Sequence, residues 1–176
     1  SETGDKNNMV IMLGHVINLN KIMRVINGNG RRRLLFGHQN LRGGSLTGNK
    51  DKRVQWELTI GDNRPDVMGL SETKLGSNDN GLCNIEGYVW ETKADSPRIS
   101  VMVNSNLDYR RRMDLEVDNM AAIWVEVGTR SKNPVLVCNI YREWQRQGEA
   151  GSGLESEQMR RWTPFVEKLK MVATSN

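Results

Sequence analysis

Polar side chains that could bind a metal ion and a phosphate recur where predicted strands of this sequence end. Glu72 follows one buried run, between the polar residues Ser71 and Thr73. The other such positions carry amides, a tyrosine and arginines: Asn40, Arg42, Asn139, Tyr141 and Arg142. Carboxylate and amide oxygens are ligands that Mg²⁺ accepts while it keeps several waters. Arginine and tyrosine suit a phosphate beside such an ion. The pattern therefore predicts a divalent-cation and phosphate site at one edge of a sheet.

The composition leaves few other materials for an active site. The 176 residues include two cysteines, which exclude a cysteine zinc site and a disulfide-rich scaffold, and two histidines, His15 and His38, which leave little room for a histidine-based metal cage. Lysine and arginine number 25 against 21 acidic residues, a net charge of +4. This mild excess permits an anionic partner such as nucleic acid without requiring one. No apolar run approaches the roughly 20 residues of a membrane-spanning helix, so no membrane segment is predicted.

The elements expected to position these residues are strands and helices in alternation. Residues 1–30 are predicted to be a leader, partly disordered or a short helix, within which residues 1–4 can be an expression-vector remnant. The helix over 156–172 places Met159, Trp162, Val166 and Leu169 on one stripe, although Pro164 favours a later start. Strands are predicted over residues 34–40, 65–72, 84–91, 98–103, 121–127 and 135–141, and helices over 50–60 and 156–172. This order predicts an α/β sandwich with a mixed, mainly antiparallel sheet and flanking helices.

Four segments resemble, in order, motifs of the endonuclease/exonuclease/phosphatase superfamily. Residues 37–43, GHQNLRG, resemble its N-x-R-G opening, and residues 65–75, PDVMGLSETKL, resemble its P-D-I-[IL]-x-[IL]-x-E-T-x-L element. Residues 98–103 resemble its short G-G-V-A-I strand, and residues 139–142 resemble its Y-R element. Over residues 34 to about 172, the sequence resembles the N-terminal two-thirds of the apurinic-type endonuclease domain of non-LTR (LINE-type) retrotransposon polyproteins.

The resemblance implies a DNA endonuclease that hydrolyses a phosphodiester with one Mg²⁺ ion, in an intracellular, nuclear setting. By position, Glu72 would be the principal Mg²⁺ ligand, and Asn40 would lie beside the metal and the scissile phosphate. Tyr141 would donate a hydrogen bond to a phosphate oxygen. Three further residues would contact the substrate phosphate: Arg142, Arg42 and Asn139. A basic triplet would contact the DNA backbone, independently of base sequence: Arg31, Arg32 and Arg33.

Two catalytic elements of the superfamily do not follow the helix predicted over residues 156–172. The superfamily continues there with Gly-Asp-x-Asn, whose aspartate orients the attacking water, and then with Ser-Asp-His, whose histidine holds the phosphate. Here the sequence ends at Asn176, and no histidine follows His38. Because such groups supply much of the rate, we expect an incomplete domain over residues 31–176 that is weakly active or inactive, with Mg²⁺ binding weak or lost.

The same incompleteness gives an expectation about association. The superfamily fold packs two sheets face to face, and this chain is expected to supply mainly one. Soluble monomers rarely expose a large apolar face, so a homo-oligomer, most simply a two-fold dimer, is predicted to bury it. The alternative to an endonuclease is accordingly a non-catalytic binding or self-assembly module derived from this fold.

Each candidate site residue also has a purely structural interpretation. Glu72 can be a solvated carboxylate at a strand end, Asn40 a turn residue, and Tyr141 a tyrosine at the core edge with a satisfied hydroxyl. The resemblance favours the metal-site interpretation of Glu72.

Other residues are expected to serve the fold. His38 is expected to be buried and hydrogen-bonded, and Cys83 and Cys138 to be unpaired thiols. The basic triplet at residues 110–112 is interpreted as a solvated face, with contact to a phosphate backbone as the alternative.

Overall fold

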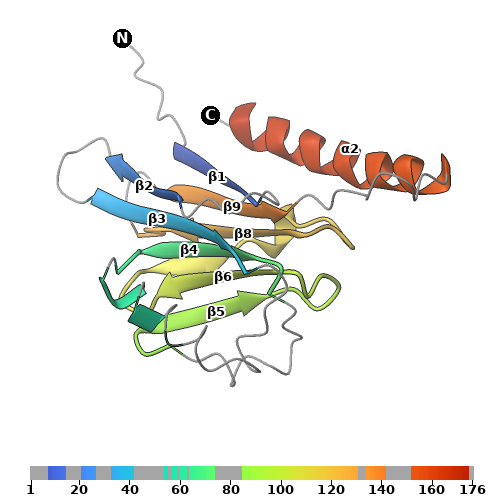
Figure 1. The fold of residues 1–176 in the computed structure, drawn as a ribbon. Coiled ribbons are helices and arrows are strands. Elements are labelled where there is room, and N and C mark those ends of the chain that lie inside the picture. The colour runs from blue at the N-terminus through green and yellow to red at the C-terminus, as the bar shows by residue number, and fades with distance from the viewer. Residues whose placement is uncertain are drawn as a thin grey trace, which may run out of the picture.

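The part of the chain that the computed structural model describes forms two β-sheets packed face to face, with a long helix on one outer side (Figure 1). The described residues are 8–14, 21–26, 33–41, 54, 57, 58, 60–62, 64–73, 85–130, 134–141 and 152–174. Most neighbouring strands are antiparallel, and the described helices are few. The predicted α/β sandwich is confirmed.

The first sheet has four strands in the order β1-β9-β8-β7. These are β1 (Asn8–Gly14), β9 (Val135–Tyr141), β8 (Ala122–Val127) and β7 (Tyr109–Arg111). β1 runs parallel to β9, and the other pairs are antiparallel. A single turn of 3-10 helix (Met113–Leu115) follows β7.

The second sheet has five strands in the order β2-β3-β4-β6-β5. These are β2 (Lys21–Ile26), β3 (Arg33–Asn40), β4 (Val67–Ser71), β6 (Ile99–Asn104) and β5 (Tyr88–Thr92). β3 and β4 are parallel, and the remaining pairs are antiparallel. The described residues between 54 and 62 are helical, as predicted for that segment.

The core between the sheets draws on both of them. In β8, Ile123, Val125 and Val127 face inward, while Trp124 faces outward, as their alternation predicts. The inner layer joins these three to the second sheet through Leu34, Phe36, Val67, Ile99, Val101 and Val103, and to β9 through Val135 and Val137. We expected the chain to supply mainly one sheet and to leave its face bare. That expectation is wrong, because each sheet covers the inner face of the other.

Helix α2 (Ser152–Thr174) covers the outer face of the first sheet, across β1, β9 and β8 (Figure 1). Its contacts come from Trp162, Phe165, Leu169 and Val172, spaced by one helical turn. The predicted stripe is confirmed at Trp162 and Leu169 and wrong at Val166, which is 38% exposed while Phe165 takes its place in the core; the side chain of Met159 is not among those described. The helix also continues through Pro164 rather than starting there. No helix among the described residues combines the length and the apolar character that crossing a bilayer requires.

The segments before residue 31 contribute strands to both sheets. The prediction of a leader or short helix is wrong for residues 8–14 and 21–26, which form β1 and β2. The apolar run in β1 has the length of a strand and ends at Gly14, and β2 contains three β-branched residues. Pairing with β9 and β3 satisfies backbone groups that a free leader would leave to water.

Candidate metal and phosphate site

The two sheets bring three of the predicted site residues together at one end of the sandwich. Asn40 ends β3 and pairs with Ser71, the last residue of β4, so the next residue, Glu72, lies at the same rim. Tyr141 ends β9 in the facing sheet. The Tyr141 hydroxyl donates to Glu72 Oε1 at 2.8 Å, and Asn40 Nδ2 donates to the same oxygen at 3.1 Å. The contact between Glu72 and Tyr141 therefore spans the two sheets.

The backbone at Glu72 turns sharply as it leaves β4. Its φ of 56° lies in the left-handed region, which costs a non-glycine residue roughly 1–2 kcal/mol. The next residue, the fully buried Thr73, stabilises this turn: its hydroxyl donates to the Pro97 carbonyl at 2.9 Å and lies 3.3 Å from the hydroxyl of Ser100. These bonds hold the Glu72 side chain at the rim, where Asn40 and Tyr141 reach it.

The donors that contact Glu72 are themselves buried, while Glu72 is partly exposed. Both described bonds go to Oε1, and no described residue donates to Oε2. A carboxylate held this way keeps one oxygen for a further ligand. Among the described residues, no group of three or more His, Cys, Asp or Glu side chains could bind a metal ion together.

Asn139 does not take the position predicted for a phosphate contact. It is 0% exposed between the sheets, and its Nδ2 donates to the Leu70 carbonyl at 3.1 Å and the Ser100 carbonyl at 2.9 Å. A side chain with no exposed surface cannot contact a substrate phosphate in this structure, so that prediction is corrected. Asn139 faces inward because it shares the strand face of Val137 and Tyr141.

The remaining predicted residues are arginines. Four of them lie outside the described residues: Arg31, Arg32, Arg42 and Arg142. Arg33 begins β3, seven residues before Asn40, which places it about 23 Å along the strand from the site. Its predicted contact with a DNA backbone would therefore lie at the other end of the sandwich from Glu72.

His38 and Cys138 were both expected to serve the fold, and both are described in the structure. Burial lowers the pKa of His38 to about 4, and its Nε2 has no hydrogen-bond partner among the described residues. His38 is thus largely buried, as predicted, but this nitrogen is not hydrogen-bonded. Cys138 is an unpaired thiol, and burial raises its pKa well above the usual value. Cys83 lies outside the described residues.

In the basic triplet at residues 110–112, Arg110 is exposed, as predicted for a solvated face, whereas Arg111 and Arg112 are partly buried, and all three bind carboxylates of the fold. Arg111 binds both carboxylate oxygens of Glu116 at 2.9 and 3.0 Å, and it reaches Glu91 of the second sheet at 3.3 Å. Arg110 and Arg112 both bind Glu126. These ion pairs connect neighbouring strands, and the charge of each arginine is paired with a carboxylate of the same fold.

Sequence reasoning missed one cation at the rim, Arg98. Its carbonyl accepts a hydrogen bond from the Thr73 amide at 3.4 Å, and the residue is exposed immediately before β6. The signal that could have identified it is the pairing of Ile99 with Ser71, which brings residue 98 close to Glu72.

The letters Gly-Asp-x-Asn do occur in the sequence, at residues 4–7, before β1 rather than after helix α2. These residues lie outside the described part of the chain. The residue that follows them, Asn8, pairs with Val135, six residues and about 20 Å along β9 from Tyr141. The strand end that does reach Tyr141 is Gly14, and His15 follows it directly, outside the described residues.

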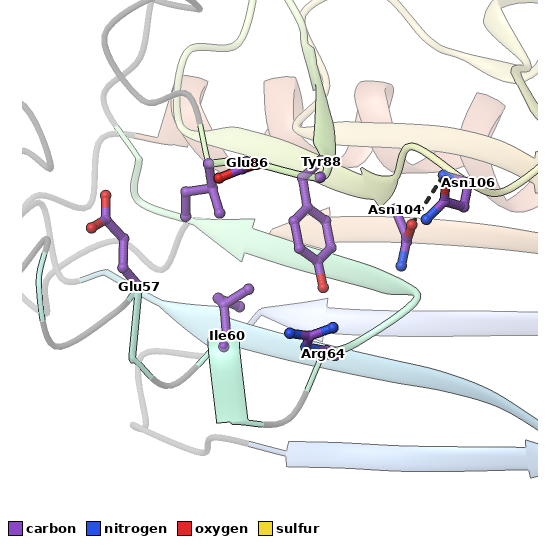
Figure 2. Close-up of a pocket in the computed structure, with 10 residues that line it drawn as sticks. Glu57, Ile60, Arg64, Glu86, Tyr88, Asn104 and Asn106 are labelled. Atoms are coloured by element: carbon purple, nitrogen blue, oxygen red, sulfur yellow. Dashed lines mark hydrogen bonds between the residues drawn. The ribbon is translucent and has the colours of Figure 1, made fainter.

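A separate hollow of about 660 Å³ lies at the opposite end of the second sheet (Figure 2). Figure 2 shows Tyr88 reaching from β5 toward Arg64, with Glu57 and Glu86 on one side and Asn104 on the other. The Tyr88 hydroxyl donates to the Pro65 carbonyl at 2.7 Å, and burial is the main cause that raises its pKa. None of the predicted site residues that the structure describes lines this hollow.

Two mostly antiparallel sheets, packed face to face and carrying polar strand ends at one rim, make an endonuclease/exonuclease/phosphatase-like fold, as the motifs predicted. The AP endonuclease LMAP from Leishmania major is similar to this chain in fold, with 14% sequence identity and a TM-score of 0.52 over 78% of this chain and 46% of that one. The endonuclease domain of TRAS1, a telomere-specific non-LTR retrotransposon, aligns with 14% identity and a TM-score of 0.45 over 72% and 50% of the two chains.

This chain thus spans about half the length of the solved structures that it matches. At this identity the likeness concerns the fold. No known sequence family matches the chain, and neither does any curated protein sequence.

Proposed function

We propose that this chain is a Mg²⁺-dependent endonuclease domain of the retrotransposon type, acting on phosphodiester bonds of DNA. The observation that carries the proposal is the contact of Asn40 and Tyr141 with one oxygen of Glu72 at the rim of the sandwich. The sequence motifs predicted these three residues as site residues, although Asn40 lies 32 residues before Glu72 and Tyr141 lies 69 residues after it. A chance set of strand-end residues would have little reason to meet.

The donor set at the rim fits Mg²⁺. This ion is commonly held through one or two carboxylates, and waters and substrate phosphates complete its coordination. Glu72 would supply the carboxylate and Asn40 an adjacent amide. When bound, the ion would supply positive charge to a phosphate oxygen and lower the pKa of a bound water.

The protein's own groups would orient the substrate. Tyr141 holds its hydroxyl at the rim, where its one proton can be donated either to Glu72 or to a phosphate oxygen. Arg98 adds an exposed cation on the same rim, with Arg42 and Arg142 proposed to join it from segments outside the described residues. A guanidinium binds phosphate through charge and paired donors.

We further propose that turnover by this chain is slow. The rim residues would hold and orient a phosphate, but the described residues offer no group of three or more acidic, histidine or cysteine side chains that could bind a metal ion there. A weak Mg²⁺ site and weak nicking are therefore expected.

Because the proposed partner is DNA, we propose that the protein acts in the nucleus. A homo-oligomer would need a surface other than the buried sheet face.

Nicking of supercoiled plasmid DNA at high protein concentration, with and without Mg²⁺, tests the proposal. We expect slow, Mg²⁺-dependent nicking, lost by about 100-fold in Glu72→Gln, which keeps the shape but not the charge. The control is Glu86→Gln, which removes an exposed carboxylate at the opposite end of the second sheet and should nick like the wild type.

Equal nicking by the wild type and Glu72→Gln would refute the assignment of Glu72. DNA binding without nicking at any Mg²⁺ concentration would favour the alternative, a non-catalytic binding module built on this fold.

A further inference from the structure

Asn139 joins the two sheets directly beneath the rim. Both hydrogens of its amide are used, one on the Leu70 carbonyl of β4 and one on the Ser100 carbonyl of β6. Leu70 and Ser100 are paired with each other in the second sheet, while Asn139 belongs to the first. One side chain of β9 therefore forms hydrogen bonds with two neighbouring strands of the facing sheet.

The hydrogen bonds of Asn139 lie two residues along each strand from the contact between Tyr141 and Glu72. Asn139 is two residues before Tyr141 on the same face of β9, and Leu70 is two residues before Glu72, which directly follows β4. Two residues of strand span about 6.7 Å, so the two intervals match. With Asn139 bound to Leu70, Tyr141 arrives opposite Glu72, where the 2.8 Å hydrogen bond forms.

An amide is a costly choice for this position. The inner layer around Asn139 is otherwise largely apolar, and its Oδ1 has no partner among the described residues. A buried acceptor without a partner lowers stability, whereas leucine at the same position would avoid that cost. Because apolar contacts are non-directional, a small sliding of one sheet on the other changes their free energy little. Two hydrogen bonds to fixed carbonyls, in contrast, would be broken by such a sliding motion.

We propose that Asn139 is a positioning residue that sets the register of β9 on β4 and so holds the Tyr141 hydroxyl on Glu72. Its relevance to phosphate chemistry rests on the proposed function, but the positioning itself does not. Asn139 does not contact the substrate, because it has no exposed surface. It acts through Tyr141.

A double-mutant cycle between Tyr141→Phe and Glu72→Ala, followed by urea unfolding, measures the coupling of the two side chains without any need for activity. In the wild-type background we expect the coupling to change the unfolding equilibrium constant about tenfold, as for a hydrogen bond to a charged group that is partly exposed. The cycle is then repeated in Asn139→Leu, which keeps the volume and removes both donors.

The control background is Val137→Ala, two residues earlier on the same buried strand face. It loosens the core between the sheets without touching a hydrogen bond between them. We expect the coupling to vanish in Asn139→Leu and to persist in Val137→Ala. If Asn139→Leu does not fold, Asn139→Thr, which keeps one hydroxyl donor, replaces it and should retain part of the coupling.

Coupling that stays near tenfold in the Asn139 background would overturn the proposal. So would equal loss in both backgrounds, because Asn139 would then contribute only general packing. Plasmid nicking by the same proteins reads the proposed function separately, so that absence of nicking with the expected cycle leaves the positioning established and rejects only the nuclease assignment.

Discussion

Arg111 offers the sharpest test of how this sandwich is held at its edge. Its guanidinium binds both oxygens of Glu116 and reaches across to Glu91 and to the Thr92 carbonyl in the second sheet. The side chains of Arg111 and Glu116 are 18% and 8% exposed. The hydrogen bond to Glu116 is the main cause that raises the pKa of Arg111, so the arginine stays charged. We predict that Arg111→Met strongly destabilises the fold.

The magnitude follows from what the substitution leaves behind. Methionine replaces the aliphatic stem but leaves the Glu116 carboxylate buried without its cation. Removing one partner of a buried pair costs about 3–5 kcal/mol, and the partial exposure of Arg111 moves the expected loss to about 3 kcal/mol. For a chain of this size, that loss lowers Tm by about 6–12 °C.

Urea unfolding of Arg111→Met and Arg110→Met gives the comparison. Arg110 precedes Arg111 on β7, but its side chain is 61% exposed, and its partner Glu126 keeps a second cation in Arg112. Its loss should cost at most about 1 kcal/mol. Equal destabilisation by the two variants, or a loss below about 1 kcal/mol for Arg111→Met, would refute the argument from burial.

Three further outcomes follow from the packing and charges already described. Phe165→Ala should lower the free energy of unfolding by about 3 kcal/mol in urea, whereas Val166→Ala, at a 38% exposed position, should change it by less than about 1 kcal/mol; equal effects would contradict the packing of α2. The folded His38 has a pKa near 4 and the unfolded one near 6.5, so the unfolded state gains a proton first as pH falls. Stability should therefore drop by up to about 3 kcal/mol between pH 6.5 and 4, and a profile of unfolding free energy that stays the same in His38→Gln would disprove this. Arg98→Ala should weaken DNA binding in fluorescence anisotropy and reduce its salt slope by about one. Arg130→Ala, 90% exposed at the opposite end of the sandwich, should leave both unchanged, and a matching loss there would argue against a specific role for Arg98.

The strands that carry the site could be predicted from the sequence because their hydrophobic pattern is unambiguous. The run over residues 135–141 becomes β9 with the same limits, and the run ending at Glu72 becomes β4. Both are buried on two faces, so continuous apolar letters identify them. The resemblance of the motifs then assigned Asn40, Glu72 and Tyr141 to one metal and phosphate site, which is why they were expected at one rim.

Other features depend on contacts that no local pattern encodes. A continuous apolar strand does not reveal which of its faces meets the other sheet, so Asn139 could not be distinguished from an exposed strand-end amide. The cation at residue 111 resembles its two neighbours in sequence, and only the fold brings Glu116 and Glu91 to it. β1 was missed because its partner, β9, lies more than a hundred residues away.

That distance along the chain bears on the order in which the protein folds. Asn8 pairs with Val135, 127 residues later, whereas β8 and β9 meet across a separation of only eight residues, from Val127 to Val135. Closing the longer loop costs about 2.5 kcal/mol more in chain entropy. Hairpins such as β8–β9 should therefore form early, with β1 adding late to a preformed edge. Because Gly14 of β1 reaches the rim beside Tyr141, the rim is completed only at the end of folding.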